Sequence, residues 1–282
     1  MSSTYNQLLD ATIQHLEDLK SRGVRNVAVA PETLRALGQP QKISTQISTL
    51  PQKPVELSIA LPGEAQSQIT NPKSQIEKST AFDELQKRAL ACLKCPHLAS
   101  SRKNVVFGVG NLDAQLMFVG EAPGADEDAQ GEPFVGRAGE LLTKIIQAMG
   151  LQRSDVYIAN ILKCRPDTPG QSAGNRKPTP EEMATCVPYL HEQIDLIQPR
   201  VLVALGATAI EGLLGKTLGI MKLRGNWKTY RGTPLMPTFH PAYLLRNQAM
   251  TEKRKVWEDM LSVMEKLEMP ISDKQRNFFT RG

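Results

Sequence analysis

Three short segments of the sequence carry side chains that could do chemistry on a bound ligand. Residues 120–128 read GEAPGADED, a tight Gly/Pro turn beside carboxylates, which are groups that act as general bases or position water. Residues 160–166 read NILKCRP and begin with an asparagine, and residues 239–246 read FHPAYLLR and contain His240. Each segment alone also suits an ordinary turn or helix cap, so their meaning depends on whether the fold brings them together.

The cysteines form a second group with chemical potential. The sequence has one C-x-x-C pair and two more cysteines far along the chain: Cys92, Cys95, Cys164 and Cys186. Two close thiolates and two distant ones can make a four-cysteine site. Buried structural cysteines and a redox C-x-x-C are the alternatives, although no strand precedes Cys92 where a redox motif needs one. The spacing favours a metal site without distinguishing zinc from a 4Fe–4S cluster.

Strands and helices are expected to alternate around these segments. Apolar runs predict four strands, at residues 115–120, 156–161, 201–205 and 235–239. Helical patterns lie between and after them, at residues 138–149, from Thr179, from Ala207 and at 251–267. The helix from Thr179 has a start signal in the sequence, with Thr179 as N-cap, Pro180 at the first position and Glu182 completing a capping box.

This alternation predicts an α/β fold with a parallel sheet covered by helices on both faces. Ligands of such sheets bind beyond the carboxyl ends of the strands. Each of the three segments follows a predicted strand, so we expect all three to converge on one rim of the sheet.

Composition sets broader limits. The chain has 282 residues, a net charge of +5 and a pI of about 9.0, a weak indication of a polyanionic partner. No apolar run approaches the ~18 residues of a membrane span, and the N-terminus lacks a secretory pattern, so we expect a cytoplasmic protein without a membrane partner. There is no P-loop, and the glycines at 108 and 110 precede a strand instead of following one.

The sequence divides into four parts. Residues 1–37 form an N-terminal helical extension, with a helix expected at 4–22, which suits docking onto the chain or binding an unknown protein partner. Residues 38–80 are rich in Pro, Gln and Ser and predict a flexible linker. Residues 81–270 form the α/β domain, and residues 271–282 form a C-terminal tail.

From about residue 81 to 267, the chain resembles family 4 of the uracil-DNA glycosylase superfamily. The resemblance rests on the motifs GEAPGADEDAQGEPFVG, NILKCRP, NRKPTPEEMATC and FHPAYLLR and on the four cysteines. It implies a three-layer α/β/α sandwich around a central four-stranded parallel sheet. It also implies a structural 4Fe–4S cluster held by Cys92, Cys95, Cys164 and Cys186. Residues 167–173, DTPGQSA, look inserted before the fourth cysteine and remove no ligand.

The activity implied by the resemblance is DNA repair. A monomeric, monofunctional hydrolase is expected to flip uracil out of single- or double-stranded DNA and hydrolyse its N-glycosidic bond, leaving an abasic site. A related branch bonds covalently to DNA through a histidine in an inserted loop, but the insertion here contains none. The alternatives are a non-catalytic iron–sulfur protein that binds uracil or damaged bases, and a zinc-stapled nucleotide-binding domain.

The resemblance also implies roles in the base pocket. Phe134 is expected to stack on uracil and Asn160 to read its edge, while backbone groups of Gly120, Glu121 and Ala122 line the pocket.

For catalysis, His240 is expected to donate a hydrogen bond to uracil O2. Ala122 stands where the best-known family of the superfamily has an aspartate, so Glu127 becomes the first candidate to orient water and Glu121 the second. Leu244 and Leu245, in the loop after His240, are candidates to wedge into the base stack, with core packing as the alternative. Arg246 is a candidate phosphate contact.

Overall fold

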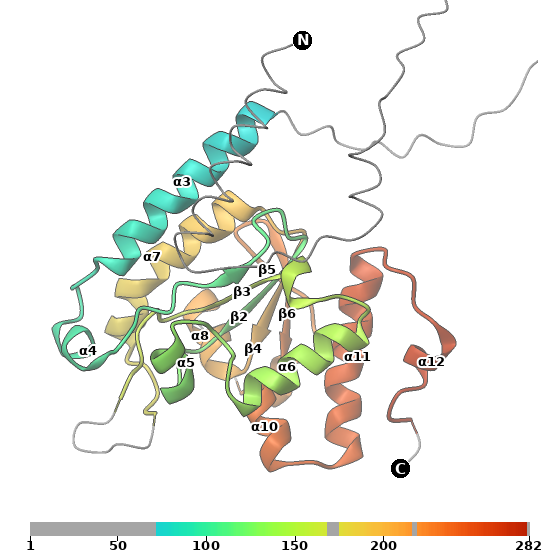
Figure 1. The fold of residues 1–282 in the computed structure, drawn as a ribbon. Helices are drawn as coiled ribbons and strands as arrows, with labels where there is room; N and C mark the ends of the chain where they lie inside the picture. The colour runs from blue at the N-terminus through green and yellow to red at the C-terminus, as the bar shows by residue number, and fades with distance from the viewer. Residues whose placement is uncertain (1–71, 168–174, 216–218, 281–282) are drawn as a thin grey trace, which may run out of the picture. The chain divides into compact units, whose positions relative to one another are not determined.

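The computed structural model describes residues 72–280, except 168–174 and 216–218 (Figure 1). The predicted extension at 1–37 and most of the predicted linker lie outside the described residues. Helix α3 spans Pro72–Leu90, so the last nine positions of the segment predicted as linker are helical. No helix in the described part of the chain has the length and apolarity needed to cross a membrane.

The sheet has six strands in the order β1-β3-β2-β4-β6-β5. Its four central strands are mutually parallel and confirm the four predicted from apolar runs: β3 (Tyr157–Asn160), β2 (Leu116–Gly120), β4 (Val201–Leu205) and β6 (Thr233–Thr238). The prediction omitted two antiparallel edge strands, β1 (Val109–Gly110) and β5 (Lys228–Tyr230). Strands of two or three residues are too short to show a periodic pattern.

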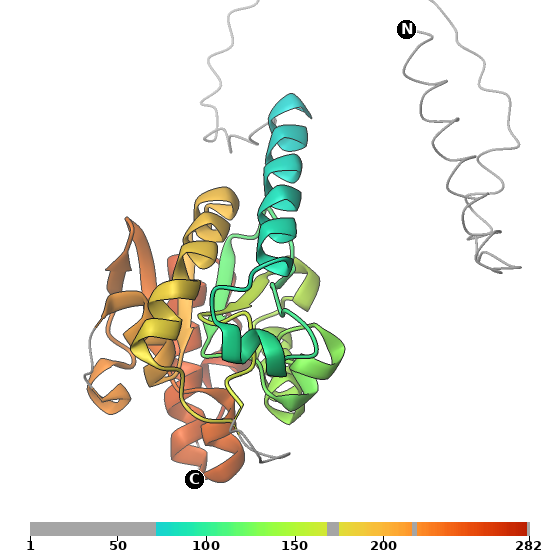
Figure 2. The same ribbon diagram turned by 90° about the vertical axis from the view of Figure 1, so that its left-hand side faces the viewer.

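Helices cover both faces of the sheet, which confirms the three-layer α/β/α architecture (Figures 1 and 2). Helices α3, α7 (Pro180–Ile197) and α8 (Ala207–Leu214) supply buried residues to one face. Helices α6 (Arg137–Ala148) and α11 (Met250–Lys266) supply the other. The central strands are therefore buried on both sides, which explains their continuous apolar runs.

Strand β2 illustrates how the two cores are divided. Met117 and Val119 join the cluster beneath α3, α7 and α8, whereas Leu116 and Phe118 join the cluster beneath α6 and α11. Successive side chains of a strand point to opposite faces, so one short apolar run serves two cores.

Helix α7 begins as its sequence signal predicts. Glu182 donates its backbone N–H to the Thr179 hydroxyl, and its carboxylate accepts the Thr179 N–H at 2.8 Å. Pro180 occupies the first position, where a missing N–H has no consequence.

Within the described residues, six short helical segments were not predicted. They are α4 (Pro96–Ser101), α5 (Ala125–Gln130), the 3₁₀ turn at Arg153–Asp155, α9 (Ile220–Leu223), α10 (Pro241–Arg246) and α12 (Asp273–Arg276). Two of them matter for the site, because α5 carries Glu127 and α10 carries Leu244 and Leu245. The expectation of a loop after His240 is therefore wrong: the chain turns directly into a helix.

Candidate functional site

The three strand-end segments meet at one cavity of about 180 Å³. Ala122 and Glu127 come from the segment after β2, Asn160 from the end of β3, and His240 from the end of β6. The whole lining is Ala122, Gly124, Glu127, Phe134, Ala138, Asn160, Asn175, His240 and Ala242. Pockets for drug-sized ligands measure roughly 300–1,000 Å³, so this smaller cavity suits a single flat heterocycle better than a whole nucleotide.

Asn160 is the last residue of β3 and is only 2% exposed. Its Oδ1 is the one buried side-chain oxygen or nitrogen among the described residues that has no hydrogen-bond partner. A buried polar atom without a partner costs about 1–3 kcal/mol, so such atoms are rare in native proteins. Asn160 is also one of the residues that line the cavity, so a ligand that brings an N–H or O–H donor is the partner this acceptor lacks.

Gly120 creates the space for that asparagine. A Cβ atom built on Gly120 would lie 2.3 Å from Asn160 Oδ1 and 2.6 Å from Phe134 Cζ. Any side chain at position 120 would therefore push both groups out of place. The carbonyls of Gly120 and Glu121 accept the N–H groups of Ile161 and Leu162, so they continue the sheet. Ala122 is the one residue of the three expected backbone contacts that lines the cavity.

Phe134 is 6% exposed, with its ring 5.6 Å from the imidazole of His240 and inclined by 29°. Its backbone is left-handed, with φ of 54°, a conformation that costs a non-glycine residue of order 1–3 kcal/mol. The guanidinium of Arg153 donates to the carbonyls of Pro133 (2.9 Å) and Phe134 (3.2 Å) and holds this loop in place. The strained, clamped loop fixes an aromatic face against the cavity.

Glu127 joins the two loops that flank the cavity. Its Oε1 accepts the N–H groups of Val135 (3.1 Å) and Gly136 (3.2 Å), and its Oε2 accepts the N–H of Gly124 (3.0 Å). A carboxylate offers about four acceptor sites, so one site on Oε2 is left for a ligand or water. Glu121 is half-buried and is not among the residues that line the cavity.

His240 occupies the N-cap of α10, and its Nδ1 accepts the backbone N–H of Ala242 at 3.1 Å. That bond requires an unprotonated Nδ1, so the proton of the neutral ring sits on Nε2. Burial, assisted by the positive charge of Arg246, lowers the pKa of His240 to about 4. At neutral pH the ring is therefore an uncharged hydrogen-bond donor, a point that the sequence left open.

The pH dependence of His240 is a first test of this site. We expect ¹⁵N NMR to show a neutral ring with its proton on Nε2 from pH 8 down to about pH 5, not titration near the usual value of about 6.5. Because the folded pKa is below the unfolded one, the unfolded chain takes up the proton first. The stability contribution of His240 is thus complete above pH 6.5 and is lost as pH falls towards 4. Titration near 6.5 in the folded protein would contradict the assigned hydrogen bond.

The three candidate DNA contacts lie on α10 in different environments. Leu244 is 5% exposed and packs in a small cluster with Phe239 and Val256. This environment agrees with core packing, the alternative to insertion into the base stack. Leu245 is half-buried and Arg246 is exposed, so these two retain surface for a contact outside the protein.

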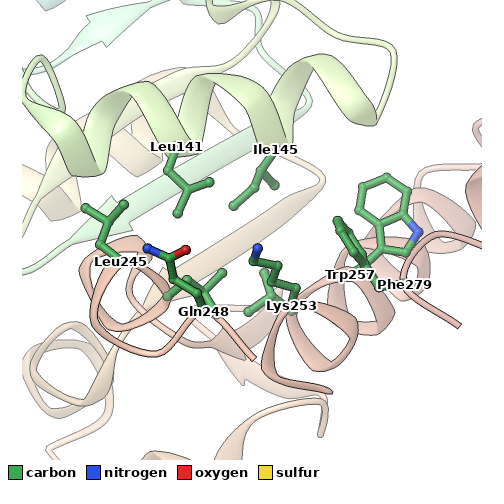
Figure 3. A pocket seen from close by; sticks show the side chains of 9 residues that line it. Leu141, Ile145, Leu245, Gln248, Lys253, Trp257 and Phe279 are labelled. Atoms are coloured by element: carbon green, nitrogen blue, oxygen red, sulfur yellow. The ribbon is translucent and has the colours of Figure 1, made fainter. Parts of the chain in front are cut away.

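A second cavity of about 240 Å³ lies between α6, α10 and α11 (Figure 3). Leu141 and Ile145 of α6 form one wall, opposite Leu245 and Lys253, with Trp257 at one end. Its lining contains no carboxylate and no imidazole. It therefore lacks the carboxylate and imidazole groups that line the first cavity, and Lys253 is its one charged lining residue.

The sequence analysis missed Asn175. This residue lines the cavity, and its Oδ1 accepts from Arg165 Nε at 2.9 Å, which leaves its amide N–H groups for other partners. A Cβ atom on Gly124 would meet both Asn175 Nδ2 (3.2 Å) and Glu127 Oε2 (2.6 Å), so the two polar groups lie beside the same turn. Asn175 is the first residue of the motif NRKPTPEEMATC, which contributed to the family resemblance but had suggested no role for this asparagine.

The four cysteines lie around one small cavity beside Arg102. They come from separate elements: Cys92 and Cys95 from the turn between α3 and α4, Cys164 after β3, and Cys186 on α7. Burial raises the pKa of Cys186 to about 11 and also raises those of Cys95 and Cys164. A redox C-x-x-C needs a lowered thiol pKa, so this environment disfavours the redox alternative.

Hydrogen bonds to sulfur already exist at this site. Arg102 Nη1 donates to Cys164 Sγ at 3.0 Å, and the backbone N–H of Lys163 donates to Cys186 Sγ at 3.2 Å. Within the described residues, no three His, Cys, Asp or Glu side chains are grouped closely enough to hold a single metal ion. The donors are thus four cysteines spread around a cavity, with N–H groups directed at two of them.

Comparison with known proteins places these features in a family. Residues 107–261 match the family model described as the uracil DNA glycosylase superfamily. The type-4 uracil-DNA glycosylase of Thermotoga maritima is 50% identical over 177 residues, covering 61% of this chain and 88% of that protein. The type-4 enzyme of Archaeoglobus fulgidus is 40% identical, covering 61% and 87%, and that of Sulfurisphaera tokodaii is 37% identical, covering 72% and 91%.

Proposed function

Because the chain belongs to the uracil-DNA glycosylase superfamily, we propose that it excises uracil from DNA by hydrolysing the N-glycosidic bond. The observation that carries this proposal is the buried, unpartnered Oδ1 of Asn160. Uracil presents N3–H, the donor that this oxygen lacks, and O4, an acceptor for the amide NH₂. Cytosine has an unprotonated N3 and an amino group in these positions, so a fixed Asn160 selects uracil.

Base extrusion makes the reaction feasible in this cavity. A base stacked in a duplex cannot reach a site of about 180 Å³, so the nucleotide must rotate out at a cost of roughly a few kcal/mol. Phe134 offers an aromatic face on which the extruded base stacks, worth roughly 1–3 kcal/mol. Leu245, which is half-buried, and Arg246, which is exposed, are the proposed contacts with the DNA that the base has left.

Bond cleavage places negative charge on the departing uracil and positive character on the sugar. His240, neutral with its proton on Nε2, donates a hydrogen bond to O2 of uracil. This bond stabilises the developing anion, and the proton stays on Nε2. Glu127, which keeps one acceptor site on Oε2, orients a water towards C1′. The water adds its oxygen to C1′ and passes a proton to Glu127, while the C1′–N1 bond breaks with its electrons on uracil. That proton then neutralises the uracil anion, and the products are free uracil and an abasic site.

Glu127→Gln is expected to lower the single-turnover rate of uracil release by roughly 10²-fold or more, because the amide is a poor acceptor for the attacking water. The matched control is Glu121→Gln, which removes the second carboxylate candidate outside the cavity and should retain the wild-type rate. Quantitation of free uracil from a labelled oligonucleotide measures both. The opposite ranking would transfer the role to Glu121.

We also propose that Cys92, Cys95, Cys164 and Cys186 hold a structural 4Fe–4S cluster. The donor set fits: each cysteine of such a cluster binds a different iron, whereas zinc needs all four sulfurs about 2.3 Å from one point. Four thiols around one cavity, with N–H groups directed at two of the sulfurs, suit the cluster. When bound, it supplies a cross-link between the α3–α4 turn, the end of β3 and α7, and takes no part in hydrolysis.

Iron analysis of the protein isolated without oxygen tests this cluster. We expect about four irons per chain, a brown colour, and a fall in Tm when iron is chelated. A cluster contribution of even about 3 kcal/mol corresponds to a fall of roughly 6–12 °C for a domain of this size. One zinc per colourless chain would instead support the zinc-stapled alternative.

The remaining expectations are proposals of the same kind. The chain acts as a cytoplasmic monomer on single- or double-stranded DNA, and residues 1–37 bind a further protein. A truncated chain of residues 72–282, compared with the full chain for oligomeric state and for uracil release, separates the extension from the activity.

A further inference from the structure

Lys163 is a buried cation that the proposed mechanism does not use. It lies in the NILKCRP segment, three residues after Asn160, and is 2% exposed. Lysine is almost never this buried unless it is paired, because moving an ammonium out of water costs several kcal/mol. Within the described residues, however, no carboxylate forms an ion pair with it.

Two neutral oxygens hold the ammonium instead. Lys163 Nζ donates to the backbone carbonyl of Asn160 at 3.0 Å and to Gln193 Oε1 at 2.6 Å. Gln193 is itself fully buried and fixed, because its Nε2 donates to the Phe107 carbonyl (2.9 Å) and the Tyr157 hydroxyl (3.1 Å). The lysine therefore connects a rigid internal network to the residue that reads the base.

The main chain of Lys163 is tied at the other end. Its N–H donates to Cys186 Sγ, its carbonyl accepts the N–H of Val106 at 2.7 Å, and Cys164 follows it directly. The residue thus spans the short distance between the cysteine site and the base cavity. Asn160 ends its strand, so the Lys163 bond to its carbonyl restrains the backbone from which the Asn160 side chain extends.

We propose that Lys163 is a positioning residue for base recognition. It holds the backbone carbonyl of Asn160 so that the side-chain amide of Asn160 meets the edge of uracil. This inference rests on the proposed function. Preorganisation explains why a buried charge is retained: the bond to the Asn160 carbonyl fixes Asn160 before the ligand arrives, so less ordering is needed on binding.

Binding to two DNA probes tests the proposal with Lys163→Met. The first probe carries 2′-fluoro-2′-deoxyuridine, whose glycosidic bond resists hydrolysis, and the second carries a tetrahydrofuran abasic analogue, which has no base to read. We expect the variant to bind the uracil probe roughly tenfold more weakly, or about 1.4 kcal/mol, and the abasic probe as well as wild type does. Tyr157→Phe is the matched control, since it alters the same buried network at a hydroxyl that does not contact Asn160 or Lys163 Nζ, and it should bind both probes normally.

The outcomes separate clearly. Equal weakening for both probes would show general damage and overturn the proposal, as would unchanged binding of the uracil probe. Should Lys163→Met not fold, Gln193→Met removes one of the two anchors of the ammonium and should weaken binding of the uracil probe alone, by roughly threefold; no selective loss there also overturns it. Wild-type protein that fails to prefer the uracil probe over a thymidine control contradicts the proposed function instead.

Discussion

Replacing Asn160 by alanine is expected to remove most uracil release while leaving the fold intact. The variant leaves both N3–H and O4 of uracil without partners in a buried cavity, at about 1–3 kcal/mol each. A combined loss of about 2–6 kcal/mol lowers kcat/KM by roughly 30-fold to 10⁴-fold. The ligand-free protein, in contrast, loses a buried oxygen that has no partner, so its free energy of unfolding should change by less than about 1 kcal/mol.

Two measurements on Asn160→Ala check this separation of activity from stability. Single-turnover uracil release gives the loss of transition-state stabilisation, and urea denaturation gives the free energy of unfolding. Asn226→Ala, which alters an exposed asparagine outside the cavity lining, is the control and should keep the wild-type rate of uracil release. If Asn160→Ala released uracil within about threefold of wild type, the base would be read by another group.

Replacement of His240 should produce the other large effect. Loss of one preorganised donor to a developing oxyanion typically lowers kcat by roughly 10²–10³-fold. His240→Ala also removes the acceptor that caps α10, so we expect a loss of about 1 kcal/mol in stability as well.

A second His240 variant distinguishes the contribution of His240 to catalysis from its contribution to the stability of α10. Asparagine is a favourable N-cap residue, so His240→Asn should regain stability while its shorter amide fails to reach uracil O2. Both variants should therefore be slow, and only the alanine variant destabilised. If His240→Asn recovered the wild-type rate, the histidine would act through the helix cap and not through the substrate.

The sequence predicted the parts of the fold that repeat a simple physical rule. The central strands are largely buried on both faces, so apolar residues dominate them, and α7 begins at a capping box that the sequence Thr179–Glu182 already shows. The convergence of the strand-end segments followed from the parallel arrangement alone. The short helices α5 and α10 were not foreseen, because six residues do not complete two helical turns.

The protonation and pairing of site residues depended on contacts that no local pattern contains. The neutral state of His240 results from burial and from the Ala242 N–H, and the acceptor capacity of Glu127 depends on loops that follow it by eight and nine residues. Leu244 and Leu245 are adjacent in sequence, yet one is packed in a cluster and the other reaches the surface. Their positions along a helix, not their chemistry, decide which of the two is buried.

Release of free uracil by the full chain under single-turnover conditions tests the central claim most directly. An oligonucleotide with one uracil, incubated with excess protein, should yield free uracil and an intact strand that breaks at that position only on alkali treatment. The same strand with cytosine should be unchanged. Tight and selective binding of the uracil strand without any free uracil would contradict excision and indicate a non-catalytic uracil-binding protein.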